Sequence, residues 1–286
     1  MRAHLGNDVL LTRTLVAACT LMVACAALTS VSGEDAGGDA SPNAALKARL
    51  QAVNEALQKQ PDSVELLARR AALLAGLDQP SAAIADYDRL IKLVPDRADL
   101  YDARGSESFK LGQIRESIAD FDRAIALRPD QEPWHWKRGI SYYYANRFDD
   151  GRKQFEGYQT VDDNDVENAV WRFLCMARQT DVATARGSML KIKRDLRVPM
   201  MEVYALYSGQ VKPADMLAAA RAGSPSPQEL NARLFYAHLY LGLYYEVLGD
   251  ASQARTEIEA ATKHRIGHYM WNVADVHAKR LATPPK

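Results

Sequence analysis

The chain has 286 residues, and its 36 basic residues balance 36 acidic residues to a formal net charge of zero at pH 7. That balance offers no basic footprint for nucleic acid and no polybasic anchor for anionic lipid. Hydrophobic residues make up 48% of the chain, which is ordinary for a globular protein, so we expect disorder only near the ends.

The start of the chain, 1–33, differs from the rest. Arg2 and Arg13 precede an uncharged run at 15–28, which is too short to span a bilayer and suits the apolar core of a secretory signal. The small residues at 31–33 then offer a cleavage site. We therefore expect 1–33 to be a secretory or lipoprotein signal and the protein to be exported.

Two cysteines leave the nature of that signal open. Cys19 and Cys25 both end short apolar stretches that resemble a bacterial lipobox, and Cys25 has the better apolar lead-in. Either one is a candidate for lipidation, and the alternative is cleavage after Gly33. The polar, glycine-rich segment 34–43 reads as a flexible linker, and the fold then follows at 44–286.

An internal repeat dominates the first half of the fold. Pro61, Pro95 and Pro129 are spaced by 34, and each is followed by aspartate. This spacing is the length of a tetratricopeptide repeat, a pair of helices joined by a turn, and proline fits after the second helix because it cannot continue one. The pattern predicts an all-α solenoid of stacked helical hairpins, with units at about 64–97, 98–131 and 132–163.

Small and large residues recur with the same period. Gly105 and Gly139 fall at a position of the first helix where the partner helix comes close, and Tyr87, Phe121 and Phe155 fall at the large aromatic position of the second helix. Large side chains set against small ones at fixed spacing are how two ridged helices interlock.

The repeat pattern changes at both ends of the array. Before the first unit, the segment 44–59 reads as a leading helix that caps the array. The third unit departs from the repeat at Gly151 and Asp163. From 165 to 222 the period is lost, and short helices are predicted at 168–179, 181–196, 200–208 and 213–222. A further unit is predicted at about 227–266, with a closing helix at 268–281.

Two stretches carry a closer resemblance. Arg138-Gly139-Ile140-Ser141-Tyr142-Tyr143-Tyr144 is followed by a degenerate middle and then by Leu241-Gly242-Leu243-Tyr244-Tyr245-Glu246-Val247-Leu248-Gly249-Asp250. With the exported start, this order resembles the bacterial TPR lipoproteins of the "new lipoprotein I" type. The resemblance implies a dimeric envelope adaptor that scaffolds a tail-specific protease and peptidoglycan hydrolases.

Motifs for chemistry are weak. His264 and His268 have the i, i+4 spacing of metal ligands, but no glutamate or third ligand accompanies them, so we expect no metal site. The acids at 162–165 lack the calcium-loop pattern and read as a helix cap. Cys175 lies in an apolar helical stretch and reads as a buried residue. We expect no cofactor, and we expect that the protein is not an enzyme.

The inner face of the repeats is the predicted partner-binding groove. Its aromatic and acidic side chains suit an apolar or basic segment of a partner better than a C-terminal carboxylate, which the acids would repel. The groove residues are Asp99, Asp102, Ser106, Phe109, Trp136, Ile140, Tyr143 and Tyr144.

The sequence therefore predicts an exported adaptor for protein–protein interactions, located in the periplasm or anchored to a membrane by lipid. Its partners would be proteins or peptides, such as an envelope protease or a peptidoglycan hydrolase, and not nucleic acid. One alternative is a structural, dimeric solenoid without a peptide-binding groove, and another is an enzyme that uses the segment 165–222.

Overall fold

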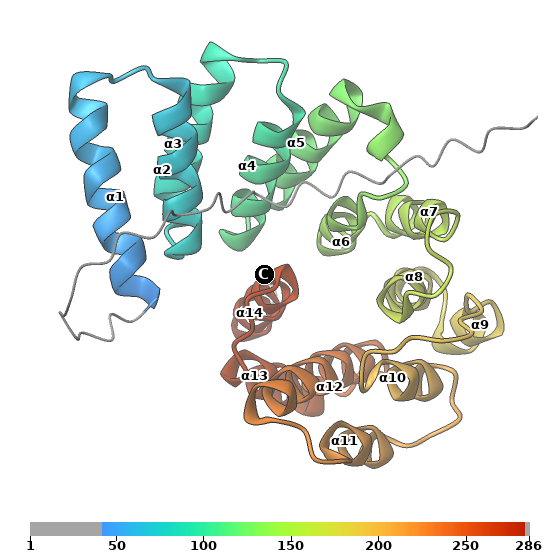
Figure 1. The fold of residues 1–286 in the computed structure, drawn as a ribbon. Helices are drawn as coiled ribbons and strands as arrows, with labels where there is room; N and C mark the ends of the chain where they lie inside the picture. Colours follow the sequence, from blue (N-terminus) through green and yellow to red (C-terminus); the bar gives the residue numbers. More distant parts are fainter. Residues whose placement is uncertain (1–41, 284–286) are drawn as a thin grey trace, which may run out of the picture. The chain divides into compact units, whose positions relative to one another are not determined.

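A computed structural model describes residues 42–283, and the predicted signal and most of the predicted linker lie outside this range. Within it the chain forms α-helices and one short 3-10 helix, with no strand (Figure 1). The predicted all-α solenoid of helical hairpins is therefore confirmed. Residues 42 and 43, assigned to the linker from sequence, already belong to the first helix.

Consecutive helices of the first half pack together as hairpins, and each hairpin packs on the next. The leading helix α1 spans Pro42–Lys59. Three hairpins follow, with a 3-10 turn, Pro129–Gln131, before the third. They are α2 (Val64–Gly76) with α3 (Pro80–Leu93), α4 (Ala98–Lys110) with α5 (Ile114–Leu127), and α6 (Trp136–Tyr144) with α7 (Phe148–Tyr158).

The second half continues the hairpin arrangement with shorter helices and longer connections. Its helices are α8 (Val166–Gln179), α9 (Val182–Gly187), α10 (Met200–Tyr207), α11 (Pro213–Arg221), α12 (Pro227–Val247), α13 (Ala251–Lys263) and α14 (Tyr269–Ala282). None of the helices between residues 42 and 283 is long and apolar enough to cross a bilayer.

The predicted helix at 181–196 is wrong over most of its length, because α9 ends at Gly187. The chain then runs without helix to the start of α10, held by contacts that a helix could not make. Arg172 donates to the carbonyl of Ser188 at 2.6 Å, and the carboxylate of Asp195 accepts from the backbone N–H of Val166 at 3.3 Å. These tertiary contacts outweigh the local helical pattern.

Glycines mark the closest approach of paired helices, as predicted. A Cβ atom added at Gly105 would lie 2.9 Å from the ring of Phe121, and one at Gly139 would lie 2.7 Å from the ring of Phe155. Gly151, a departure from the repeat, is explained by Cys175, whose sulfur would be 2.8 Å from an added Cβ. Real Cβ contacts are not this short, so any larger residue would push the helices apart.

A ladder of arginines, with the period of the repeat, joins the second helices of successive units. Arg104, on α4, donates to Asp120 in its own unit (2.6 Å) and to Asp88 in the preceding unit (2.6 Å). The same pair of contacts, one forward and one back along the chain, recurs at each arginine of the ladder. The rungs are Arg70 with Asp86 and Asn54, Arg104 with Asp120 and Asp88, Arg138 with Gln154 and Asp122, and Arg172 with the carbonyl of Ser188 and Glu156.

The fourth rung corrects the prediction that the period is lost from residue 165. Arg172 falls one repeat period after Arg138, and Glu156 falls one period after Asp122. Helix α8 therefore keeps the register of the repeat, and the departure begins one helix later than predicted. The ladder ends where the non-helical segment after α9 supplies a backbone carbonyl in place of a side chain.

The last helix returns to the first half of the solenoid. Figure 1 shows α14 on the inner side of the curve, facing α4 and α6. The hydroxyl of Tyr144, on α6, lies 3.0 Å from Nδ1 of His277 on α14. Before α14, Arg265 pairs with Asp78, far earlier in the chain, at 3.1 Å. The described residues thus close on themselves through the segment that begins at 265.

Candidate functional site

The eight residues of the predicted groove do lie together on α4 and α6, but α14 covers much of that face. Phe109 is fully buried, with its ring centroid 5.5 Å from that of Tyr269 on α14. Ile140 is 1% exposed. Trp136 is half-buried between His268 and Tyr269, at ring distances of 6.1 and 5.4 Å. In this conformation the chain's own helix takes the place where a partner was expected.

The polar members of the predicted groove remain partly open. Asp99 is exposed and pairs with Arg97. Asp102 accepts from Lys137 at 2.6 Å, and the same ammonium donates to the hydroxyl of Ser106 at 3.2 Å. Burial alone would raise the pKa of Asp102, but His135 and Lys137 hold it well below its usual range. These side chains are engaged with neighbours of their own chain.

Tyr143 and Tyr144 belong to a buried network that fixes α14. The hydroxyl of Tyr143 donates to Glu246 of α12 at 2.9 Å, and Tyr144 contacts His277. Glu246 also lies 3.7 Å from Nε2 of His277 and 3.4 Å from Arg178 of α8. Four helices therefore meet at one carboxylate. We define Tyr143, Tyr144, Glu246 and His277 as the latch.

Burial lowers the pKa of His277 to about 4, although the charge of Glu246 acts in the opposite direction. The imidazole is therefore neutral at neutral pH, which suits a ring that is fully buried. Burial raises the pKa of Tyr143 and Tyr144 well above the ordinary tyrosine value. At neutral pH Tyr143, Tyr144 and His277 are therefore uncharged, and Arg178 is the cation that pairs with Glu246.

Beside the latch, a cavity of about 390 Å³ opens within the curve of the array. That volume falls in the range of small-ligand pockets. Its walls come from the third hairpin, α8, the non-helical segment after α9, α12 and the start of α14. The lining residues are Trp136, Ile140, Phe155, Tyr158, Asp165, Glu167, Asn168, Trp171, Arg197, Tyr236, His268 and Met270.

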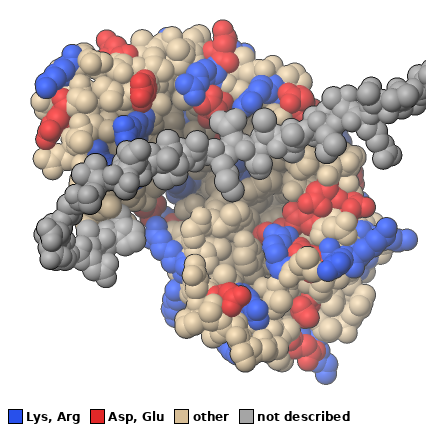
Figure 2. Space-filling view, in the orientation of Figure 1, with Lys and Arg blue, Asp and Glu red and all other residues tan. Residues whose placement is uncertain are grey.

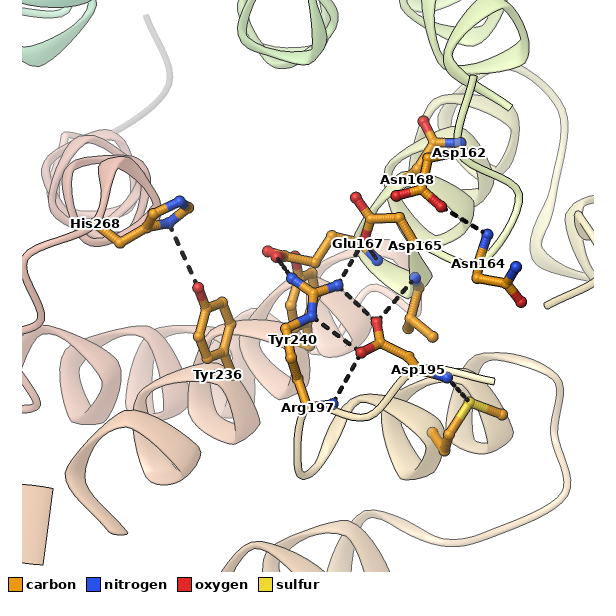
Figure 3. A network of polar contacts seen from close by, with 12 residues as sticks. Asp162, Asn164, Asp165, Glu167, Asn168, Asp195, Arg197, Tyr236, Tyr240 and His268 are labelled. Atoms are coloured by element: carbon orange, nitrogen blue, oxygen red, sulfur yellow. Dashed lines mark hydrogen bonds and ion pairs between the residues drawn. The ribbon is translucent and has the colours of Figure 1, made fainter. Parts of the chain in front are cut away.

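One side of the cavity carries a cluster of charged groups, drawn in Figure 3. The guanidinium of Arg197 bonds to Asp165 at 2.7 Å, to Glu167 at 2.6 Å and to Asp195 at 2.6 Å. The hydroxyl of Tyr240 donates to the second oxygen of Glu167 at 2.6 Å. Three carboxyl groups thus surround one cation, and we call Asp165, Glu167, Asp195 and Arg197 the acid cluster.

Local sequence explains how the acid cluster forms. Asp165 is the N-cap of α8, and its side chain accepts from the backbone N–H of Glu167 at 3.0 Å, so the predicted capping role is confirmed. Capping holds Asp165 and Glu167 at the first turn of α8. Asp195 then bonds to the backbone N–H of Arg197 at 3.0 Å, which orients the guanidinium toward that turn.

Glu167 is held in an environment that disfavours its charge. Burial raises the pKa of Glu167 to about 7, and the nearby Asp165 acts in the same direction, while Arg197 and the Tyr240 hydroxyl oppose the shift. Burial also lowers the pKa of His268, on the opposite wall, so that ring is neutral at neutral pH. The cavity therefore has acidic character that Arg197 only partly offsets.

Sequence reasoning placed Trp136 and Ile140 at a binding face but missed Glu167, Arg197 and Tyr236. Glu167 lies on α8, Arg197 on the non-helical segment after α9 and Tyr236 on α12, and only the tertiary fold brings them together. One available signal was the bunching of acids at 162–165 directly before a helix. It was interpreted as a cap alone, although a cap also places the next turn's side chains.

The two histidines considered as metal ligands do not converge. His264 lies 3.1 Å from the side chain of Asn231, and His268 lies 3.4 Å from the hydroxyl of Tyr236. Among the described residues no group of three or more acidic, histidine or cysteine side chains is arranged to hold a metal. Cys175 is fully buried, and burial raises the pKa of its thiol well above the usual range.

The fold and the inner cavity define a helical-repeat protein whose hairpins stack into a curved array. The sequence profile of the tetratricopeptide repeat matches residues 98–131, which are α4, α5 and the turn that follows. The described residues are therefore an all-α solenoid that contains the tetratricopeptide repeat.

Solved structures of similar fold share little sequence with this chain. A tetratricopeptide repeat protein from Parabacteroides merdae is 12% identical, over 83% of this chain and 93% of that one, with a TM-score of 0.51. MamA is 17% identical over 64% and 90%, with a TM-score of 0.48. YrrB, described as a TPR protein with an unusual peptide-binding site, is 14% identical over 81% and 99%, with a TM-score of 0.42. At such identities the likeness concerns the fold alone.

Proposed function

We propose that the protein is an exported, non-catalytic adaptor that binds protein partners in a bacterial cell envelope. The tetratricopeptide architecture supports the adaptor role, because stacked hairpins present long, continuous faces assembled from many units. The observation that carries the proposal is the cavity within the curve, where aromatic and acidic side chains from distant parts of the chain meet. Apolar anchors beside charged groups are typical of protein-binding surfaces.

Export rests on the sequence before residue 34. The apolar run at 15–28 supports a signal, and Cys25 or Cys19 supports a lipid anchor. Intact-mass measurement on the protein from its native host tests this part. The expected start is Glu34, or a lipidated Cys25 or Cys19, whereas an unprocessed chain in the cytosol would contradict export.

The resemblance to envelope lipoproteins supports two finer proposals. The partner would be a protease or a peptidoglycan hydrolase, and the adaptor would be a homodimer. Affinity capture from envelope extract, with the full chain as bait, tests the first. The matched control is Gly242→Leu, which should disrupt the α12–α13 hairpin. Reproducible enrichment of a defined protein by the wild-type chain alone is expected, and equal recovery by both baits would contradict the adaptor role.

A second candidate function is favoured by one observation. Because α14 packs against Phe109 and Tyr144, and Tyr143 is buried against Phe148 and Trp171, most of the apolar surface of the predicted groove is already buried within the chain. A solenoid closed in this way suits a structural protein that spaces other envelope components. Capture that returns no partner, together with a stable homodimer in solution, would favour this candidate over the adaptor.

A further inference from the structure

The inner cavity combines aromatic walls with an excess of acid. Trp136 stacks on His268 with an interplanar angle of 17°, and Phe155 stacks on Trp171 with an angle of 22°. Ring faces carry negative electrostatic potential, so they attract cations that approach them, by about 0.5–2 kcal/mol per contact. The walls therefore favour a flat, cationic group over an anionic one.

The acid cluster adds negative charge to the negative potential of the ring faces. Asp165 and Glu167 line the cavity with Arg197, while Asp195 binds Arg197 from outside the lining. With Glu167 ionised, three carboxylates against one guanidinium give the cluster a charge of −2, and with Glu167 protonated the charge is −1, so the cluster is negative in either state. Arg197 is thus already committed to acids of its own chain and has little attraction left for an anion. A cation placed beside Glu167 would stabilise the charged form that burial now disfavours.

Two residues of the lining each carry a buried polar atom without a partner. Oδ1 of Asn168 and the indole N–H of Trp171 make no hydrogen bond within residues 42–283, and both atoms lie beneath the cavity surface. Buried polar groups are almost always hydrogen-bonded, so each such atom points to a ligand or water. The amide oxygen suits an N–H donor. The indole N–H suits a carbonyl oxygen, which a peptide carries and a simple amine lacks.

We propose that this cavity binds an arginine side chain presented by a peptide segment of a partner protein. A guanidinium is planar, stacks on aromatic rings and offers several N–H donors to carboxylates, whereas a lysine ammonium is a compact, strongly hydrated charge. The inference rests on the proposed adaptor function, since it names the chemistry of the partner at this site. It goes beyond that function by assigning the residues and the side chain that they recognise.

Titration calorimetry with the full chain tests the proposal. The probes are N-acetyl-arginine amide, a blocked pentapeptide whose one charge is a central arginine, n-propylguanidine, N-acetyl-lysine amide and N-acetyl-glutamate amide. The pentapeptide should bind most tightly, the lysine probe more weakly than the arginine amide, and the glutamate probe not at all. Propylguanidine binding as tightly as the pentapeptide would overturn the peptide source, and equal binding of all probes would overturn the proposal.

Variants localise the binding. Glu167→Gln keeps the shape but removes a charge at the cavity, and it should weaken the pentapeptide about tenfold, the effect of losing roughly 1.4 kcal/mol. Asp165→Asn keeps the cap of α8 and should weaken binding several-fold, so it serves if Glu167→Gln does not fold. The control is Glu259→Gln, an exposed glutamate on α13 outside the cavity lining.

The outcomes separate this inference from the adaptor function. Weakening by both cavity variants with no effect of Glu259→Gln supports the arginine site. An unchanged affinity in folded Glu167→Gln and Asp165→Asn overturns it. If envelope extract yields a partner whose capture is unaffected by either cavity variant, the arginine site fails while the adaptor function stands.

Discussion

At the residue scale, glycines decide how closely paired helices approach. An added Cβ at Gly242 would lie 2.5 Å from the side chain of Ile258 and 3.1 Å from its backbone nitrogen, which cannot move aside. Gly242→Ala should therefore destabilise the protein by about 1–3 kcal/mol, the usual cost of overpacking. The matched control is Gly157→Ala on α7, where an added Cβ meets nothing within 4 Å.

Urea unfolding of the two variants checks this prediction. Gly157→Ala should be neutral or stabilising by about 0.5–1 kcal/mol, because alanine favours the helix. If Gly242→Ala unfolds at the same urea concentration as wild type, α12 and α13 do not approach each other as closely as in this structure.

A second residue-scale prediction concerns pH and His277. Its pKa falls from an ordinary value near 6.5 when unfolded to about 4 when buried. The unfolded chain therefore binds the proton more tightly, so stability should fall as pH drops from about 6.5 to about 4. The loss should approach roughly 3 kcal/mol, for a shift of about two and a half units. Above about pH 7.5, one unit over the unfolded pKa, this histidine should contribute no pH dependence.

Urea unfolding at several pH values tests whether the free energy of unfolding falls as the pH is lowered. His277→Gln can still form a hydrogen bond with the Tyr144 hydroxyl but cannot take up the proton, so its stability should decline less between pH 6.5 and 4. Glu246, Arg178 and Arg280 are the charged groups that influence this site, and they are the same in both proteins. Parallel curves for wild type and His277→Gln would contradict the assignment.

At the element scale, the arginine ladder holds successive hairpins in register. Arg104→Met would leave the carboxylate of Asp120, whose side chain is 8% exposed, without its partner. Such a change should cost about 3 kcal/mol, since a buried unpaired charge is strongly destabilising. The double variant Arg104→Met/Asp120→Leu should recover much of the loss, because it removes both buried charges.

Thermal and urea unfolding of the single and double variants gives the coupling free energy between Arg104 and Asp120. The control is Arg123→Met on α5, whose contact to Asp96 is longer, 3.8 Å, and exposed. That pair should contribute under about 1 kcal/mol. A double variant that is no more stable than Arg104→Met would show that the rung does not act through charge pairing.

Some helices of the fold could be predicted from the sequence and others could not. The hairpins of the first half were predictable because one period repeats both the small glycines and the prolines. The fourth rung, Arg172, was visible in the same period but went unrecognised, because the proline and alanine at the expected positions were absent. The non-helical stretch after Gly187 was not predictable, since Asp195 and Arg197 bind residues far from them in the chain.

At the scale of the whole molecule, the position of α14 decides which surfaces are available. Its sequence is amphipathic like any closing helix, and no periodicity shows that it turns back to α4 and α6. The predicted groove residues lie on α4 and α6, and their exposure depends on this return. The cavity also depends on the return of α14, because His268 and Met270 line it together with Trp136 and Asn168.

On the face shown in Figure 2, lysine and arginine are interspersed with aspartate and glutamate. The resemblance to envelope lipoproteins leads us to propose a homodimer. Sedimentation at micromolar concentration should give about twice the mass of the processed chain. A monomer that stays monomeric on concentration would contradict the dimer.

Closure of the array by the segment that ends in α14 is the central claim, because both the covered groove and the cavity depend on it. Arg265 and Asp78 meet at 3.1 Å although they lie far apart in the chain. The double variant Asp78→Cys/Arg265→Cys should be linked within one chain by a short bis-maleimide, and peptide mapping should identify the link. Both cysteines are introduced into a chain whose Cys19, Cys25 and Cys175 are replaced by alanine, so that single variants can link only between chains and serve as controls. If the dilute double variant gives no intramolecular link while remaining folded, the array is open and α14 does not cover the predicted groove.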